Sequence, residues 1–255
     1  MSTSFKVDLN TDMGEGFGAY TMGDDAAILN VVTSANIACG FHAGDPEIMA
    51  QTFAMAKEKN VAVGAHPGFP DLWGFGRRVM AFTPGQIERL VAYQIGAAQA
   101  LSAYAGHPIT HVKAHGALSN LSAQDPAVAA AISRAVKAVD PSLICLVMAL
   151  GDHAKIAQDM GLITRAEIFA DRAYTEEGHL LSRKEPGAVI HDPQLAAERV
   201  VRMIKGQGVE TISGKIFKCP VDSICVHSDT PAAVEIAKTI RNLLVSEGIE
   251  VSNFT

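Results

Sequence analysis

Side chains that can transfer protons or bind a metal recur at short spacings along the chain. In chain order they are Asp8, Asn10, Asp12, His42, His66, Lys113 and His115. Two kinds of hydrolytic chemistry are open to this set. In one, either aspartate binds a divalent metal together with His42 and His66, and the metal activates a water molecule. In the other, an aspartate acts as general base, and Lys113 or His115 stabilises the developing negative charge.

Two common site signatures are missing from the sequence. No H-E-x-x-H occurs, so the metal ligands would have to come from separate segments. Gly214-Lys215 is not followed by Ser or Thr and lacks a glycine at the required position, which excludes a phosphate-binding loop of the G-x-x-x-x-G-K-[ST] type. A nucleotide would therefore be bound in some other way, or by a partner.

The surroundings of His42 predict a ligand-binding crevice. The apolar run 35–38 ends a predicted strand, and a tight turn with glycine on either side of His42 follows. Asp45-Pro46 then begins a helix, because Asp is a preferred N-cap and Pro fits the first turn. Ligands of α/β proteins bind between the carboxyl end of a strand and the start of the next helix.

Seven such strands alternate with helices. The predicted strands are residues 5–10, 35–38, 61–65, 109–114, 143–148, 167–170 and 223–227. The predicted helix starts share a capping side chain followed by proline: Asp45-Pro46, Thr83-Pro84, Asp125-Pro126, Asp192-Pro193 and Thr230-Pro231. A further helix is predicted from residue 152 to residue 160, ending at Gly161.

This alternation predicts an α/β protein with a parallel sheet. Seven units in about 250 residues fit a (β/α) barrel or a doubly wound sheet. No G-x-G-x-x-G follows the first strand, which favours the barrel. With no linker or repeat visible, residues 1–255 are expected to form a single domain.

Alternation within the strands predicts a polar barrel interior. Val7 and Leu9 share one face of the first strand, and Asp8, Asn10 and Asp12 share the other. Two other strands repeat the pattern. In the fourth strand the inward face carries His111, Lys113 and His115, and in the last strand it carries Cys225, His227 and Asp229. Buried charges are costly unless paired, so we expect these polar rows to form a site at the mouth of the barrel.

The longest predicted loop, residues 67–79, follows His66 and contains the chain's tryptophan, Trp73. Its glycines permit a hinge, so we expect it to close over the site as a lid. Arg77 and Arg78 could bind a carboxylate or phosphate, with one of the two making a structural salt bridge instead. Asp171 and Arg172, after the sixth strand, are further candidates for substrate binding.

Composition narrows the classes of partner. The formal net charge is −6, and no more than two basic residues adjoin, which argues against nucleic acid or anionic membrane. No window approaches a membrane span or signal peptide, and the four cysteines include no C-x-x-C pair. We therefore expect a cytoplasmic protein. The sequence is compatible with a homo-oligomer.

The segments that carry these residues resemble the LamB/YcsF family. The matching stretches span nearly the whole chain: D-L-N-T-D-M-G-E from Asp8, N-I-A-C-G-F-H-A-G-D-P from Asn36, G-A-H-P-G-F-P-D from Gly64, G-F-G-R-R from Gly74, V-K-A-H-G-A-L-S-N from Val112, F-A-D-R-A-Y from Phe169 and V-H-S-D from Val226.

The resemblance implies a distorted seven-stranded TIM-like barrel, similar to the glycoside hydrolase and deacetylase barrels. It also implies hydrolytic opening of the lactam 5-oxo-L-proline (pyroglutamate) to L-glutamate, coupled to ATP hydrolysis in a multi-subunit complex. ATP would then be bound by the separate partner subunits B and C of this 5-oxoprolinase. Asp12 is the first candidate for the base or metal ligand in this reaction, and Asp8 is the next.

Two other functions fit the same residues. A metal-dependent deacetylase of carbohydrates would contain a stoichiometric ion and act without partner subunits. A non-catalytic scaffold subunit would use its polar rows structurally, so that replacing Asp12 or His42 would change stability and leave activity of the complex intact.

Overall fold

The computed structural model describes residues 5–228 and 232–255. The predictions made for Asp229 and for the helix start at Thr230-Pro231 lie outside these residues. In the described part of the chain, no helix combines the length and the apolarity that crossing a bilayer requires.

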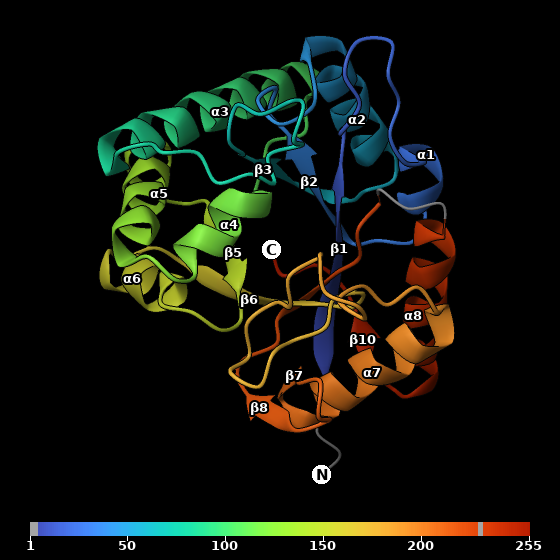
Figure 1. Cartoon of the computed structure of the whole chain (residues 1–255). Helices are drawn as coiled ribbons and strands as arrows, with labels where there is room; N and C mark the ends of the chain where they lie inside the picture. The colour runs from blue at the N-terminus through green and yellow to red at the C-terminus, as the bar shows by residue number, and fades with distance from the viewer. Residues whose placement is uncertain (1–4, 229–231) are drawn as a thin grey trace.

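Seven parallel strands close into a barrel (Figure 1). They are β1 (Lys6–Met13), β2 (Ser34–Ala38), β3 (Ala62–His66), β4 (His111–Val112), β5 (Ile144–Met148), β6 (Thr164–Phe169) and β9 (Ser223–Cys225). Pairing of β9 with both β6 and β1 completes the ring. The predicted distorted seven-stranded barrel is confirmed, with strand ends that differ by up to three residues. A short strand, β10 (Glu250–Val251), lies beside the beginning of β1.

Helices surround the strands (Figure 1). They are α1 (Asp25–Ile28), α2 (Pro46–Glu58), α3 (Pro84–Ala105), α4 (Gly116–Ser122), α5 (Pro126–Val139), α6 (His153–Asp159), α7 (Pro193–Gly206) and α8 (Ala233–Ser246). The four predicted starts that are described are confirmed: Asp45, Thr83, Asp125 and Asp192 each cap a helix whose first turn contains proline. The apolar faces of the helices and strands form a buried core cluster.

Some short elements were not predicted. Between β6 and β9 the chain forms α7 and then an antiparallel hairpin of β7 (Gly208–Glu210) and β8 (Ile216–Lys218). β7 and β8 lie outside the predicted strands, and α1 and α4 begin without the capping residue followed by proline that predicts α2, α3, α5 and α7. The interpretation of residues 1–255 as one domain stays a prediction.

The interior of the barrel is polar, as the alternation predicts. Asp8, Asn10 and Asp12 point inward and are buried, whereas Val7 and Leu9 belong to the apolar core. His111 crosses the interior so closely that a Cβ on residue 64 would lie 2.3 Å from its ring, which explains the glycine in β3. Asn10 lies between the two aspartates and donates to Ser223 and to Glu167, so the polar side chains form one connected row along the inward face of β1.

Candidate active site

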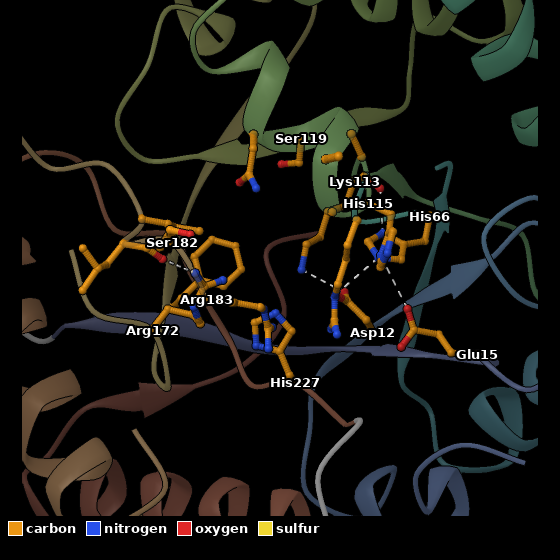
Figure 2. A pocket seen from close by; sticks show the side chains of 18 of the residues that line it. Asp12, Glu15, His66, Lys113, His115, Ser119, Arg172, Ser182, Arg183 and His227 are labelled. Carbon is orange, nitrogen blue, oxygen red and sulfur yellow. Dashed lines mark hydrogen bonds and ion pairs between the residues drawn. The ribbon is translucent and has the colours of Figure 1, made fainter. Parts of the chain in front are cut away.

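A cavity of about 460 Å³ opens at the carboxyl ends of the strands (Figure 2). Six of the predicted site residues line it, namely Asp12, His66, Arg77, Lys113, His115 and Arg172. Further lining residues include Glu15, Ser119, Asn120, Ser182, Arg183, Lys184 and His227. The remaining predicted residues, Asp8, Asn10, His42, Arg78 and Asp171, do not line it.

The Lys113 ammonium lies at the centre of the site and is buried. It donates to the Asp12 carboxylate at 2.8 Å and forms an ion pair with Glu167, also at 2.8 Å. The Cys225 thiol lies 3.1 Å away. Asn10 sits just beneath and donates to Glu167 at 2.9 Å. Lys113 is thus held between two carboxylates, one from β1 and one from β6, the two strands that flank β9.

This pairing decides the charge of both groups. Burial alone would lower the pKa of Lys113, but the nearby Asp12 carboxylate raises it well above its usual value. Burial alone would raise the pKa of Asp12, but His66 and Lys113 hold it well below its usual range. Asp12 is therefore an ionised carboxylate at neutral pH, with one oxygen on Lys113 and the other 3.3 Å from His66 Nε2.

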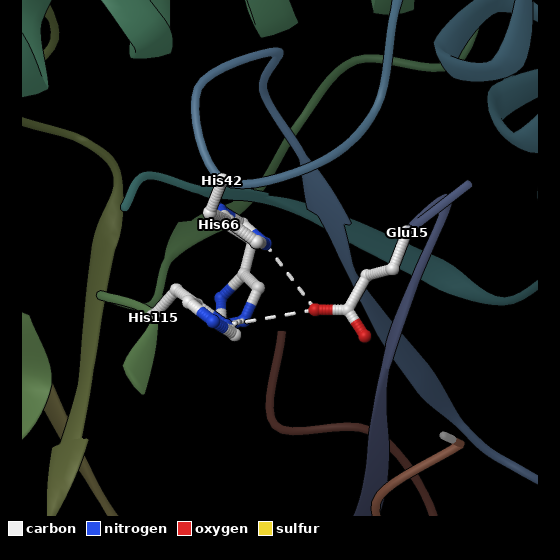
Figure 3. Close-up of side chains that lie close together, drawn as sticks. All are labelled: Glu15, His42, His66 and His115. Atoms are coloured by element: carbon white, nitrogen blue, oxygen red, sulfur yellow. Dashed lines mark hydrogen bonds and ion pairs between the residues drawn. The ribbon is translucent and has the colours of Figure 1, made fainter. Parts of the chain in front are cut away.

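Glu15 and three histidines form a compact buried cluster beside Asp12 (Figure 3). One ligand atom of each of Glu15, His42, His66 and His115 lies within 4.8 Å of the others. Glu15 Oε1 is 3.2 Å from His42 Nε2 and 3.5 Å from His115 Nδ1. The rings of His42 and His115 stack at 3.7 Å between centroids. Three imidazoles and a carboxylate are a usual ligand set for a divalent transition metal.

Backbone carbonyls fix the orientation of two of these rings. The Lys113 carbonyl lies 2.8 Å from His66 Nδ1, and the Phe75 carbonyl lies 2.8 Å from His115 Nε2. Because a carbonyl can only accept, both of those nitrogens carry the proton in the neutral rings. His66 Nε2 and His115 Nδ1 lie 3.0 Å apart, and His66 Nε2 also lies 3.3 Å from Asp12 Oδ2, so these two nitrogens are placed to bind a cation when they carry no proton.

The protonation state of the cluster also suits a metal. Burial and the neighbouring His115 lower the pKa of His42 well below its usual value. Burial and His66 do the same for the pKa of His115. Neutral imidazole is the form that binds a metal. His42 Nδ1 is buried and has no hydrogen-bond partner among the residues that the structure describes. The donor set fits a divalent ion.

His42 and His66 lie together, as the metal hypothesis requires, and the structure adds Glu15 and His115 to their cluster. Metal binding by this cluster stays a prediction. Neither Glu15 nor Glu167 was among the residues predicted for the site. Glu167 could have been found as the acid in an otherwise largely apolar predicted strand.

The expectation that Asp8 lies at the mouth of the barrel is wrong. Asp8 belongs to the opposite end, where it lines a separate hollow with residues 252–255. It accepts hydrogen bonds from Thr33 at 2.7 Å, from Ser34 at 2.8 Å, and from Ser223. Its burial raises its pKa to about 6. Asp8 lies two inward positions before Asp12, so it cannot reach the cavity that Asp12 lines.

The two arginines of the predicted lid differ as expected. Arg78 donates from Nε to the Asp71 carboxylate at 2.9 Å, a contact within the loop itself, and Arg77 lines the cavity. Phe75 lies against His42 and His115, whereas Trp73 is 98% exposed and shields nothing. The loop therefore lies over the histidine cluster, and its opening and closing stay a prediction.

The two predicted substrate-binding residues after β6 differ in their position relative to the cavity. Asp171 accepts a hydrogen bond from His227 Nδ1 at 2.9 Å and does not line the cavity. Beside it, Arg172 does line the cavity. Arg172 therefore remains a candidate for substrate contact, while Asp171 is joined to the cavity only through its bond to His227.

Comparisons with known proteins identify the family of this chain. A protein of Gluconobacter oxydans (strain 621H), named as the A subunit of 5-oxoprolinase, is 60% identical over 253 residues, or 99% of this chain and 100% of that protein. One of the same name from Azorhizobium caulinodans is 59% identical, covering 97% of this chain and 98% of that protein. The crystal structure of a lactam utilization protein from Thermus thermophilus matches with a TM-score of 0.92 and 44% identity, over 98% of this chain and 100% of that one.

A more distant match shows likeness of fold alone. The catalytic domain of a peptidoglycan N-acetylglucosamine deacetylase from Eubacterium rectale matches with a TM-score of 0.54 and 10% identity, over 100% of this chain and 91% of that one. The sequence profile of the LamB/YcsF family matches residues 7–255. With that match and relatives of such high identity along the whole chain, the protein belongs to the LamB/YcsF family.

Proposed function

We propose that this chain is the A component of a multi-subunit, ATP-dependent 5-oxoprolinase and opens the lactam ring of 5-oxo-L-proline to give L-glutamate. The observation that carries the proposal is the buried ion pair of Asp12 and Lys113 at the mouth of the barrel, beside the Glu15–histidine cluster. The names of the relatives and of the lactam utilization protein support the substrate.

The substrate explains the need for ATP. The lactam is an unstrained amide with a poor leaving group, and phosphorylation of its oxygen, with loss of the N–H proton, leaves a reactive C=N carbon. Water adds to this carbon, and the C–N bond then breaks as the ring nitrogen takes up a proton, which leaves an acyl phosphate. A second water releases phosphate and the new side-chain carboxylate. Subunits B and C are proposed to bind ATP and carry out the phosphorylation.

Asp12 is the proposed base. One of its oxygens is occupied by Lys113 and by Asn36, which donates at 2.9 Å, and the other faces His66. This second oxygen can take the proton from the attacking water. Lys113 or His115 would stabilise the negative charge that develops as the C–N bond breaks and the ring opens.

A divalent metal is part of the proposal. Glu15, His42, His66 and His115 would hold it, and such an ion would lower the pKa of a bound water toward 7. The His66 and His115 side chains are already turned toward one another by the two carbonyls described above, so binding would need little rearrangement.

The direct experiment uses the chain together with its partner subunits. We expect 5-oxoproline-dependent ATP hydrolysis and equimolar release of glutamate, both of which require this chain. If the partners without this chain release glutamate at the same rate, the proposal fails. We also propose that the reaction takes place in the cytoplasm, where ATP is present, and that the chain acts as one domain.

The Glu15–histidine cluster also favours one alternative, a metal-dependent deacetylase. That function predicts release of acetate from acetylated carbohydrate by this chain alone, with a stoichiometric metal ion and no need for ATP. A second test separates catalysis from a scaffold role, because a scaffold would keep full activity of the complex when Asp12 is replaced by Asn.

A further inference from the structure

The cavity has a second wall that the chemistry proposed above does not use. Figure 2 shows Arg172, Ser182 and Arg183 gathered on one side and Asp12, Glu15, His66 and His115 on the other. Lys184 lines the same cavity, and Arg77 reaches it from the loop after β3. We call Arg77, Arg172, Arg183 and Lys184 the basic wall. Asp12 and Glu15 are the acids among the described lining residues, and both contact Lys113 or the histidines.

Arg172 is the fixed part of this wall. Its side chain is buried and donates from Nη2 to the Leu181 carbonyl at 2.6 Å and from Nε to the Ala188 carbonyl at 3.3 Å. These carbonyls orient the guanidinium but carry no net charge, and the neighbouring Asp171, which accepts from His227, is the acid that acts on it. Burial, followed by the nearby Arg183, lowers the pKa of Arg172 to about 10. Positive charges are thus crowded together at the edge of a cavity, an arrangement that a bound anion would stabilise.

The other residues around this part of the cavity supply hydrogen-bond donors that an anion can use. Arg183 and Lys184 are exposed at the rim, and Ser182 lies next to them. Ser119 and Asn120 of the opposing segment line the same space. Guanidinium groups bind phosphate or carboxylate oxygens in pairs, and a lysine adds a point charge. A dianionic phosphate matches several cations better than a carboxylate with a single charge does.

We propose that the basic wall binds the phosphoryl group of the activated lactam, so that the phosphorylated form enters this chain and inorganic phosphate leaves from it. This rests on the proposed function. It places the ring carbon between the phosphate at the basic wall and Asp12 on the far side. Arg172 and Arg183 would hold the phosphate, Lys184 and Arg77 would add charge, and Ser182 would donate a hydrogen bond.

The carboxylate of 5-oxoproline, which carries a single negative charge, could bind the same cations. The test therefore compares a phosphate with a carboxylate. The probes are inorganic phosphate and acetate, each titrated into the isolated chain by calorimetry. The variant is the double substitution Arg183→Gln with Lys184→Gln. Its control is Arg134→Gln with Lys155→Gln, which removes the same charges from exposed ion pairs on α5 and α6, away from the cavity.

We expect phosphate to bind the parent and the control alike, and at least about tenfold more weakly to the Arg183/Lys184 variant. In the complete complex the same variant should raise the inhibition constant of phosphate by a similar factor, with a smaller change in KM for 5-oxoproline. Equal phosphate binding by all three proteins would overturn the proposal. So would a variant that loses acetate binding and raises KM while its phosphate binding is unchanged, because the wall would then bind the carboxylate.

The two proposals can fail separately. If the complex releases no glutamate while phosphate binding still depends on Arg183 and Lys184, the phosphate site stands and the assigned reaction is wrong. If glutamate is released and phosphate binding does not depend on them, the reaction stands and the phosphate site is wrong. Should the double variant be unstable, Lys184→Gln alone gives the same comparison with a smaller expected change.

Discussion

The barrel holds two buried aspartates on the same inward face of β1, and their surroundings are opposite. Asp8, at the amino end, is bonded to the hydroxyl groups of Thr33, Ser34 and Ser223. Asp12, at the carboxyl end, is bonded to the Lys113 ammonium and lies beside His66. Both are nearly inaccessible, with 1% and 5% of their surfaces exposed.

The partners give the two carboxylates different properties. Neutral hydroxyls do not offset the cost of burying a charge, so burial raises the pKa of Asp8 to about 6. At Asp12 the cost of burial is outweighed by His66 and Lys113, which keep its pKa well below the usual range. Asp8 therefore ties β1 to its neighbours, while Asp12 presents a permanent charge to a cavity. Position along one strand has separated a structural role from a chemical one.

The largest expected effect is on activity, from matched substitutions of the two aspartates. Asp12→Asn should lower glutamate release by the complex at least about a hundredfold, the scale of a lost acid–base group. Asp8→Asn should leave the rate within a few-fold of the parent. Steady-state assays of both purified variants, with circular dichroism to confirm folding, measure the difference. Similar losses of activity in the two variants would contradict the different roles assigned to Asp8 and Asp12.

Removal of the metal should have the next largest effect. Chelation of the complex should lower activity about ten- to a hundredfold, with recovery on adding Zn²⁺. Metal analysis of Glu15→Gln should show less bound ion than the parent, whereas Asp8→Asn should keep the parental content. A fully active, metal-free parent protein would contradict the assignment of the cluster.

A smaller effect is expected at the second partner of Lys113. Glu167→Gln keeps the shape and leaves Lys113 paired with Asp12, so we expect about a tenfold loss of activity and a small loss of stability. Lys113→Met should instead lower stability by about 3–5 kcal/mol, because it leaves two buried carboxylates unpaired. Chemical denaturation of both variants distinguishes these outcomes. Equal losses of stability in the two variants would contradict the assignment of Lys113 as the common partner of Asp12 and Glu167.

The smallest effect concerns stability and pH at the amino end. Folding raises the pKa of Asp8 from 3.8 to about 6, so the folded chain binds more protons than the unfolded chain between these values. Stability conferred by Asp8 is therefore present below pH 4 and falls as pH rises to about 6, by up to about 3 kcal/mol. The free energy of unfolding of the parent minus that of Asp8→Asn should follow this decline. If this difference rises between pH 4 and pH 6, folding lowers the pKa of Asp8 and the prediction is wrong.

Much of the architecture could be read from local pattern. Capping residues before proline predict where helices begin, because the side-chain bonds that start a helix are made within three residues. The alternation of Asp8, Asn10 and Asp12 with apolar residues predicts a polar interior, because side chains of a strand point alternately to its two faces. Convergence of Asp12, His66, Lys113 and His115 follows from the strand ends on which they lie, and the sequence predicts it too.

What tertiary structure decided was which polar groups meet. Glu15, rather than Asp8, joins His42 because the chain beyond β1 turns back over the barrel mouth. Glu167 of β6 reaches Lys113, just after β4, across the inside of the barrel past the intervening β5, a contact between residues that no local pattern links. Arg77 and Arg78 are neighbours of the same type, and the loop's path alone sends one to the cavity and the other to Asp71. Sequence period sets the face on which a side chain points. Its depth along the barrel axis and its partners depend on strand register and closure, which are long-range properties.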